Sequence, residues 1–151
     1  MKKILHLDMD GVLVDLEHSI NEWLEKYPDV AYRFEKFPDH IPGIFRNPPP
    51  IKDAIEAVHK LHKSGKYEMF ISTAAPWDNP YASSDKRFWI ETHFGTLFRR
   101  KMFISHRKDM IVGDYLIDDR VVYGAGEFKG EHIHFGSEKF PDWNKVLEYL
   151  L

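Results

Sequence analysis

The sequence predicts an α/β protein in which a parallel β-sheet is flanked by helices. Short apolar runs with strand character alternate with segments whose apolar residues recur at helical spacing, which is typical of such a sheet. The chain has 151 residues, of which 43% are hydrophobic and 30% charged. It therefore corresponds to one globular domain and not to a disordered or fibrous protein.

The first expected elements precede a proline-rich insert. Residues 4–7 form a short apolar run that ends in acid, as in a buried strand, and residues 13–27 carry apolar side chains at helical spacing. Five prolines fall between Pro38 and Pro50, with aromatic residues among them, which favours a compact insert over the sheet. An ordinary packed loop is the alternative. Within a single domain we expect a core of about residues 1–15 and 51–151 and a cap insert of about 16–50.

After Pro50 the alternation resumes. A helix with one apolar face is expected from Ile51, ending before Gly65. Ser84 is expected to cap a further helix that closes at Gly95, and Pro141 to be the first residue of a terminal helix. Further strands are expected at residues 66–71, 101–104, 115–117 and 131–135.

Charge, cysteine content and hydropathy exclude several classes of function. A formal net charge of −3 supplies no basic field for a nucleic acid polymer or an anionic membrane. The absence of cysteine excludes disulfides, thiolate zinc sites and cysteine nucleophiles. His6, Asp8 and Asp10 interrupt the N-terminal apolar run, and no later stretch approaches the ~18 apolar residues of a membrane span. We therefore expect a cytoplasmic protein.

Asp8 and Asp10 are the residues that indicate chemistry most directly. They follow the first strand at alternate positions, so both side chains should project to one side, and Gly11 permits a sharp turn after them. Two close carboxylates repel unless a cation lies between them. Oxygen ligands suit Mg²⁺, and ligands bind at the carboxyl ends of the strands in such sheets.

Two further strands end in polar residues that should reach the same edge. Asp118 is the expected metal ligand, with Asp119 behind it. Asp114 would lie at the opposite end of that strand, about 13 Å from Asp118, and cannot share the metal. Ser72 and Thr73 close another strand, where a hydroxyl and backbone N–H groups can hold phosphate oxygens.

A phosphoryl group also needs positive charge beyond the metal. Lys86, at the start of a predicted helix, is the preferred candidate, and Lys101 and Lys108 are the alternatives. Two histidine pairs have spacings that permit metal binding, but neither has an evident third ligand and we discount both. They are His59 with His62, and His132 with His134.

Four segments resemble those of a known family. They read, in order, LHLDMDGVLVDLE, FISTAAP, DKRFWIETHFG and HRKDMIVGDYLIDDR. The chain thereby resembles the haloacid dehalogenase-like (HAD) phosphohydrolases, and most closely the 5′(3′)-deoxyribonucleotidases. The resemblance implies a Rossmann-like, HAD-type sheet with a small, mainly helical cap inserted after the first strand.

The resemblance also implies a role for each site residue. Asp8 would be the nucleophile that forms an aspartyl-phosphate, and Asp10 the general acid and then base, with its backbone carbonyl on Mg²⁺. Asp118 would complete the metal shell of Asp8, Asp10 and Asp118. Thr73 would bind phosphoryl oxygens and Lys86 would pair with the nucleophile and the phosphate. Substrate binding is expected from Thr73, Ala74, Lys86 and the cap residue Phe45, although Phe34, Phe37 and Phe45 could instead form the core of the insert.

These inferences predict a Mg²⁺-dependent phosphomonoesterase that acts on deoxyribonucleoside 5′- or 3′-monophosphates. One alternative keeps the chemistry with another small phosphomonoester, such as a phosphosugar. The others are a receiver-like signalling domain and a catalytically silent ligand-binding relative. The expected partner is the small-molecule substrate, without nucleic acid polymer or membrane, and a homodimer is left open.

Overall fold

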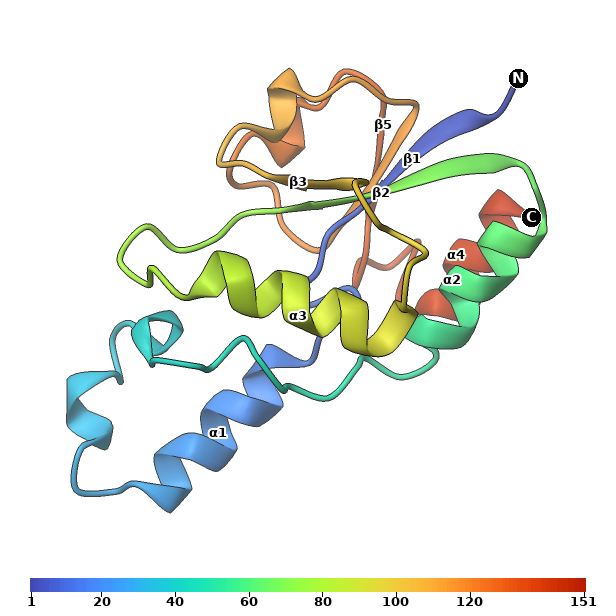
Figure 1. Ribbon diagram of the computed structural model, residues 1–151. Helices are drawn as coiled ribbons and strands as arrows, with labels where there is room; N and C mark the ends of the chain where they lie inside the picture. The colour runs from blue at the N-terminus through green and yellow to red at the C-terminus, as the bar shows by residue number, and fades with distance from the viewer.

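Five parallel strands form a single sheet in the order β3-β2-β1-β4-β5 (Figure 1). The structure is a computed structural model that describes residues 1–151. The strands are β1 (Lys3–Leu7), β2 (Tyr67–Thr73), β3 (Met102–Ile104), β4 (Tyr115–Asp118) and β5 (Glu131–His134). The strand order reverses on either side of the central β1, and ligand sites in open α/β sheets lie at such a reversal.

Three of the four α-helices pack on one face of this sheet. They are α2 (Ala54–Lys63), α3 (Ala82–Phe94) and α4 (Trp143–Leu150), and their buried residues join those of the strands in one core cluster. On the opposite face a smaller cluster of Leu116, Ala125 and Phe128 covers β4. That face carries the short 3₁₀ helices η3 (Lys108–Met110) and η4 (Ala125–Glu127). The parallel sheet and the α/β class are thus confirmed. None of the helices has the length and apolar character needed to cross a membrane.

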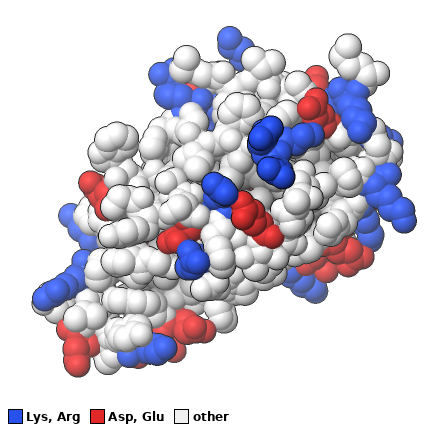
Figure 2. Space-filling view, viewed as in Figure 1, with Lys and Arg blue, Asp and Glu red and all other residues white.

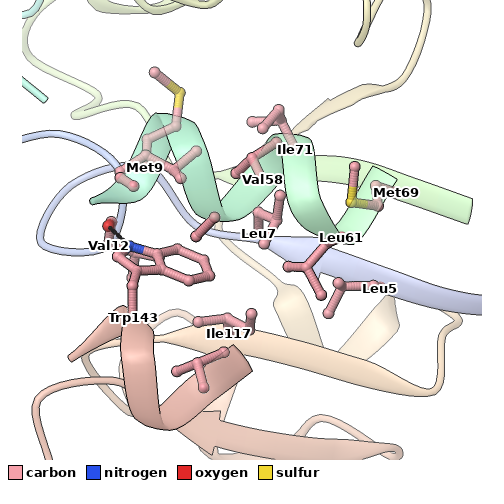
Figure 3. Close-up of a cluster of buried hydrophobic side chains, with 14 of the residues drawn as sticks. Leu5, Leu7, Met9, Val12, Val58, Leu61, Met69, Ile71, Ile117 and Trp143 are labelled. Atoms are coloured by element: carbon pink, nitrogen blue, oxygen red, sulfur yellow. Dashed lines mark hydrogen bonds between the residues drawn. The ribbon is translucent and has the colours of Figure 1, made fainter. Parts of the chain in front are cut away.

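The main core fixes the turn that follows β1 (Figure 3). Leu5 and Leu7 of β1 lie between α2 and α4, and Trp143 of α4 is fully buried among them. The indole Nε1 of Trp143 donates to the backbone carbonyl of Val12 at 2.9 Å. Burying side chains of this size contributes about 1.5–3 kcal/mol each. Through Trp143 and Val12, the core therefore fixes the position of the segment that contains Asp8 and Asp10.

The insert after β1 consists of α1 (Leu16–Lys26) and the 3₁₀ helices η1 (Ala31–Arg33) and η2 (Pro38–His40). Ile41, Ile44 and Phe45 form a separate small cluster with Ala82 at the start of α3. The insert thus lies beside the N-terminal half of α3 (Figure 1). Trp89 of α3 fixes the C-terminal end of the insert, because its indole Nε1 donates to the carbonyl of Pro48 at 2.8 Å. The division of the domain into core and cap stays a prediction.

Four expected helix starts are wrong by two or three residues, and one of them is that of α2, which begins at Ala54 and not at Ile51. The helix expected from residue 13 begins at Leu16, because Asp15 caps it by accepting the N–H of His18 at 3.2 Å. Ser84 caps nothing: α3 already begins at Ala82, and the Ser84 hydroxyl donates back to the carbonyl of Tyr81. Pro141 precedes the terminal helix, which Asp142 caps.

On the face shown in Figure 2, lysine and arginine side chains lie among aspartate and glutamate side chains. This distribution accompanies the formal net charge of −3.

Candidate active site

The carboxyl ends of β1, β2 and β4 meet at a cavity of about 120 Å³. Asp8 directly follows β1, and its N–H donates to the carbonyl of Ile117 on β4 at 2.9 Å. Asp118 is the last residue of β4 and Thr73 the last of β2. Parallel strands deliver these side chains to one edge because their ends coincide in register. The cavity is lined by Asp8, Asp10, Leu16, Asp39, Phe45, Thr73, Ala74, Pro76, Lys108, Asp118, Asp119, Arg120, Val122 and Tyr123.

Lys108 enters this cavity between two carboxylates. Its Nζ lies 2.9 Å from Oδ1 of Asp8 and 2.6 Å from Oδ2 of Asp118, and the residue is 3% exposed. The backbone N–H of Lys108 donates to the carbonyl of Tyr123 at 2.7 Å, which holds η3 over the site. The sequence favours Lys86 as the partner of the nucleophile, with Lys108 as one alternative, but in the structure Lys108 is the lysine that contacts Asp8.

Lys86 reaches the same site from α3 and binds a different pair of groups. Its Nζ lies 2.7 Å from Oδ2 of Asp10 and 2.8 Å from Oγ1 of Thr73. The residue is 1% exposed, and its ammonium lies 4.9 Å from the ring centroid of Phe45. Lys101, the other alternative, faces Glu68 at 3.8 Å on the surface and does not line the cavity.

The carboxylates that come closest together are those of Asp8, Asp118 and Asp119. One oxygen or more of each lies within 4.8 Å of the others. The carboxylate of Asp10 is instead held by Lys86. Asp119, expected only behind Asp118, packs its carboxylate directly against Gly11, whose φ of 80° is in the left-handed region. The sequence signal for Asp119 was its place beside Asp118 at the strand end.

Burial dominates the electrostatics of these groups. It raises the pKa of both Asp8 and Asp10, although Lys108 and Lys86 respectively oppose the shift. Burial and the nearby charges of Asp8 and Asp118 raise the pKa of Asp119 to about 7. Burial alone would lower the pKa of Lys108, but Asp8 and Asp118 outweigh it, and the pKa lies above its usual value.

The donor set suits a hard divalent cation. Five aspartates line the cavity, against Lys108 and Arg120 in the lining and Lys86, which contacts Asp10, so negative charge is in excess. Oδ1 of Asp119 and Oδ1 of Asp10 are both buried without a hydrogen-bond partner. Buried polar atoms are rarely left unpaired, and all-oxygen ligands at this spacing are what Mg²⁺-type ions select. The residues present therefore fit such an ion.

The other expected residues lie as follows. Thr73 is buried, and its Oγ1 accepts from Lys86 and faces the carbonyl of Ala74 at 3.4 Å. Ala74 lines the cavity, and Phe45 lines it as a buried ring of the insert cluster. Asp114 is remote, because its Oδ2 accepts the N–H of Ile4 at the opposite end of the sheet.

Sequence reasoning missed the rim of the cavity. Arg120 and Tyr123 line it from the loop after β4, and Tyr123 adopts an unusual φ of 55°. Trp77 follows the lining residue Pro76 and is 86% exposed. The hydrophobic periodicity that predicts helices and strands does not extend to such loop residues. Their place shortly after the carboxyl end of a strand is the one sequence signal that could have identified them as lining residues.

Comparison with known proteins places the chain in a family. A sequence model described as "5' nucleotidase, deoxy (Pyrimidine), cytosolic type C protein" matches residues 2–144. A protein of Vibrio phage KVP40, provisionally named 5′(3′)-deoxyribonucleotidase, is 43% identical over 99% of this chain and 85% of its own length. A Bordetella bronchiseptica protein with the same provisional name is 31% identical over 86% of this chain and 81% of its own length. The human cytosolic 5′(3′)-deoxyribonucleotidase is 25% identical over 93% of this chain and 77% of its own length. This chain therefore belongs to the 5′(3′)-deoxyribonucleotidase family of HAD-like phosphoric monoester hydrolases.

Proposed function

We propose that the protein hydrolyses deoxyribonucleoside 5′- or 3′-monophosphates through an aspartyl-phosphate, with Mg²⁺ as cofactor. The observation that carries the proposal is the convergence of Asp8, Asp118, Asp119 and Lys108 in one cavity, with Lys86 bound to the lining residues Asp10 and Thr73. A carboxylate nucleophile, a cation site and two fixed ammonium groups are what phosphoryl transfer requires. Family membership makes the receiver-like alternative wrong.

Asp8 acts as the nucleophile in this proposal. One carboxylate oxygen of Asp8 forms a bond to phosphorus while the bond from phosphorus to the ester oxygen breaks. The departing oxygen takes the proton of Asp10, whose pKa burial raises, as a general acid requires. Asp10 then accepts a proton from water as the water attacks the acyl phosphate. Inorganic phosphate leaves and the Asp8 carboxylate is restored.

The two lysines have separate roles in the proposal. Lys108 holds the Asp8 carboxylate in place beside Asp118, and its charge opposes the rise in the pKa of Asp8 that burial causes. Lys86, Thr73 and the backbone of Ala74 bind the phosphoryl oxygens, and Lys86 also orients Asp10. The ring of Phe45 packs against the Lys86 ammonium. These fixed charges stabilise the negative charge of the transition state without reorganisation.

Mg²⁺ would be held by the carboxylates of Asp8 and Asp118 and by the backbone carbonyl of Asp10, as the resemblance implies. The structure adds the Asp119 carboxylate to the candidates, because it lies within the same group of oxygens. When bound, the ion neutralises charge on the phosphate and so reduces its repulsion of the attacking carboxylate.

The dimensions of the cavity bear on the substrate. Its volume of about 120 Å³ is below the range of about 300–1,000 Å³ that encloses a whole drug-sized ligand. A nucleotide would therefore place its phosphate inside and its base outside, at the rim. Trp77 and Tyr123 offer aromatic surface there for stacking. The small volume also fits a phosphosugar, which stays the second candidate.

Phosphate release from dUMP, dTMP, dGMP, UMP and a phosphosugar, with Mg²⁺ and with EDTA, tests the proposal. We expect Mg²⁺-dependent release from the deoxynucleotides that is abolished in Asp8→Asn. Release from the phosphosugar alone would be consistent with the proposed mechanism but would contradict the proposal that deoxynucleotides are the substrates. No release from any of them would favour a silent binding relative. The cytoplasmic location and the homodimer stay predictions, for cell fractionation and light scattering to test.

A further inference from the structure

Two histidines of the edge strand β5 point toward the acidic end of β4. His132 and His134 occupy alternate positions of β5, and their rings stack with centroids 5.3 Å apart at 15°. Nε2 of His132 lies 3.1 Å from the carbonyl oxygen of Asp118, and Nε2 of His134 lies 2.9 Å from that of Asp119. A carbonyl oxygen can only accept, so both imidazoles donate. Through Nε2 the pair thus binds the backbone of the two acids.

The carbonyls of Asp118 and Asp119 differ in whether they accept a second hydrogen bond. That of Asp118 also accepts the backbone N–H of Phe135 at 3.0 Å, as part of the pairing of β4 with β5. Asp119 lies just beyond the end of β4, and its carbonyl has no hydrogen-bond partner other than His134. His134 therefore provides the only hydrogen bond to this carbonyl.

The position of that peptide matters because of the Asp119 side chain. Its carboxylate lies within the group formed with Asp8 and Asp118, and three such groups repel one another in the absence of a cation. Arg120, the next residue, is held through its N–H by Oδ1 of Asp118. A hydrogen bond to the Asp119 carbonyl opposes rotation of the chain that would carry the carboxylate away.

We propose that His134 is a positioning residue for the divalent-cation site: it holds the Asp119 carbonyl and thereby keeps the Asp119 carboxylate beside those of Asp8 and Asp118. The inference rests on the proposed cation site. His132 stacks against the exposed ring of His134 but donates to the Asp118 carbonyl and not to that of Asp119. Groups that orient metal ligands from behind typically account for about 10–100-fold in metal affinity.

Isothermal titration of the metal-free protein with Mg²⁺, without substrate, tests this role. We expect His134→Leu to raise the Kd for Mg²⁺ about tenfold. His134→Gln, whose amide can still donate, should restore most of the affinity. The asparagine side chain of His134→Asn is polar but too short to reach the carbonyl. This variant should therefore lose as much Mg²⁺ affinity as His134→Leu, although it introduces no apolar side chain. His132→Leu should change the Kd little, because Phe135 still holds the Asp118 carbonyl.

Activity gives a second readout. In His134→Leu the Mg²⁺ concentration that gives half the maximal rate should rise. The kcat at saturating Mg²⁺ should stay within about threefold of the wild type, because the substitution disturbs the alignment of a metal ligand but removes no reacting group. His62→Leu, on the exposed side of α2, is the matched control. An unchanged Kd in His134→Leu, or an equal loss in His132→Leu, would overturn the assignment to His134. Failure of the wild type to bind any divalent cation would instead remove the proposed site itself, and the inference with it.

Discussion

Lys108 and Asp8 stand 100 residues apart in the chain and form a buried ion pair with 2.9 Å between Nζ and Oδ1. The same ammonium lies 2.6 Å from Asp118. It therefore separates two carboxylates that would otherwise repel each other, while Lys86 contacts Asp10 and Thr73. The positive charge of the site is divided between two lysines with different partners.

The first prediction follows from this division. Lys108→Met should lower kcat by a factor of about 10²–10³, since it leaves Asp8 and Asp118 without their common cation. Lys86→Met should raise the KM for substrate more strongly than Lys108→Met does, because Lys86 binds with Thr73 where phosphate oxygens are expected. Steady-state kinetics at saturating Mg²⁺ distinguishes the two effects.

Lys101→Met is the control for both variants, because Lys101 is on the surface facing Glu68. Its kinetics should match those of the wild type. Full turnover in Lys108→Met combined with loss of turnover in Lys86→Met would show that the sequence-based preference for Lys86 was correct and that the contact with Asp8 is not needed.

The second prediction concerns Gly11. It combines a φ of 80° with close contact to the Asp119 carboxylate, which a Cβ would overlap. Gly11→Ala should therefore displace Asp119 and abolish Mg²⁺-dependent activity, in addition to the cost of about 1 kcal/mol for alanine in a left-handed conformation.

Gly43→Ala separates the two effects. Gly43 has a similar φ of 77° in the insert, but nothing lies within 4 Å of an added Cβ. This variant should lose stability by about 1 kcal/mol and keep its activity. Melting temperature and kcat are measured for both variants. Equal activity in the two alanine variants would mean that the contact between Gly11 and Asp119 is unimportant.

The strands and the edge where they meet could be predicted from sequence because they depend on short-range pattern. Apolar runs that end in acid or hydroxyl locate β1, β2 and β4, and parallel pairing brings their ends together whatever the intervening loops do. The remote position of Asp114 followed from the rise of a strand alone.

Two features of the site depended on long-range contacts and could not be predicted in this way. Lys108 reaches Asp8 only because its N–H binds Tyr123, which places η3 over the cavity. Asp10 lies beyond β1 in a turn, where the alternation of strand side chains no longer applies, and its carboxylate turns to Lys86. The start of α3 was misplaced for a local reason, since Ser84 hydrogen-bonds within the first turn.

The third prediction is a pH dependence of stability in the metal-free protein. The pKa of Asp119 is about 7 in the folded chain, against 3.8 for an ordinary aspartate side chain. Between these values the folded state holds a proton that the unfolded state has released, so stability falls as the pH rises toward 7. In EDTA, Asp119→Asn should therefore gain in melting temperature relative to the wild type from about pH 5 to about pH 8.

Mg²⁺ should reverse this order. A ligand that binds only the folded state stabilises it, so the wild type should gain more than Asp119→Asn at saturating Mg²⁺. Differential scanning fluorimetry across the pH range is sufficient for both measurements. Parallel pH profiles of the two proteins in EDTA would show that Asp119 does not titrate as a buried carboxyl.

The fourth prediction concerns the base of the proposed nucleotide substrate. Trp77 follows Pro76, which lines the cavity, and is 86% exposed, so its replacement removes little packing. Trp77→Ala should leave the melting temperature unchanged and raise the KM for dUMP by about tenfold, the scale of one stacking contact. The KM for a phosphosugar should stay the same, because such a substrate has no base to stack. Tyr32→Ala removes another exposed ring, 66% accessible in η1 and outside the cavity lining, and should change neither KM. An equal rise in both KM values for Trp77→Ala would point to a distorted phosphate site, and no rise in either would place the base away from Trp77.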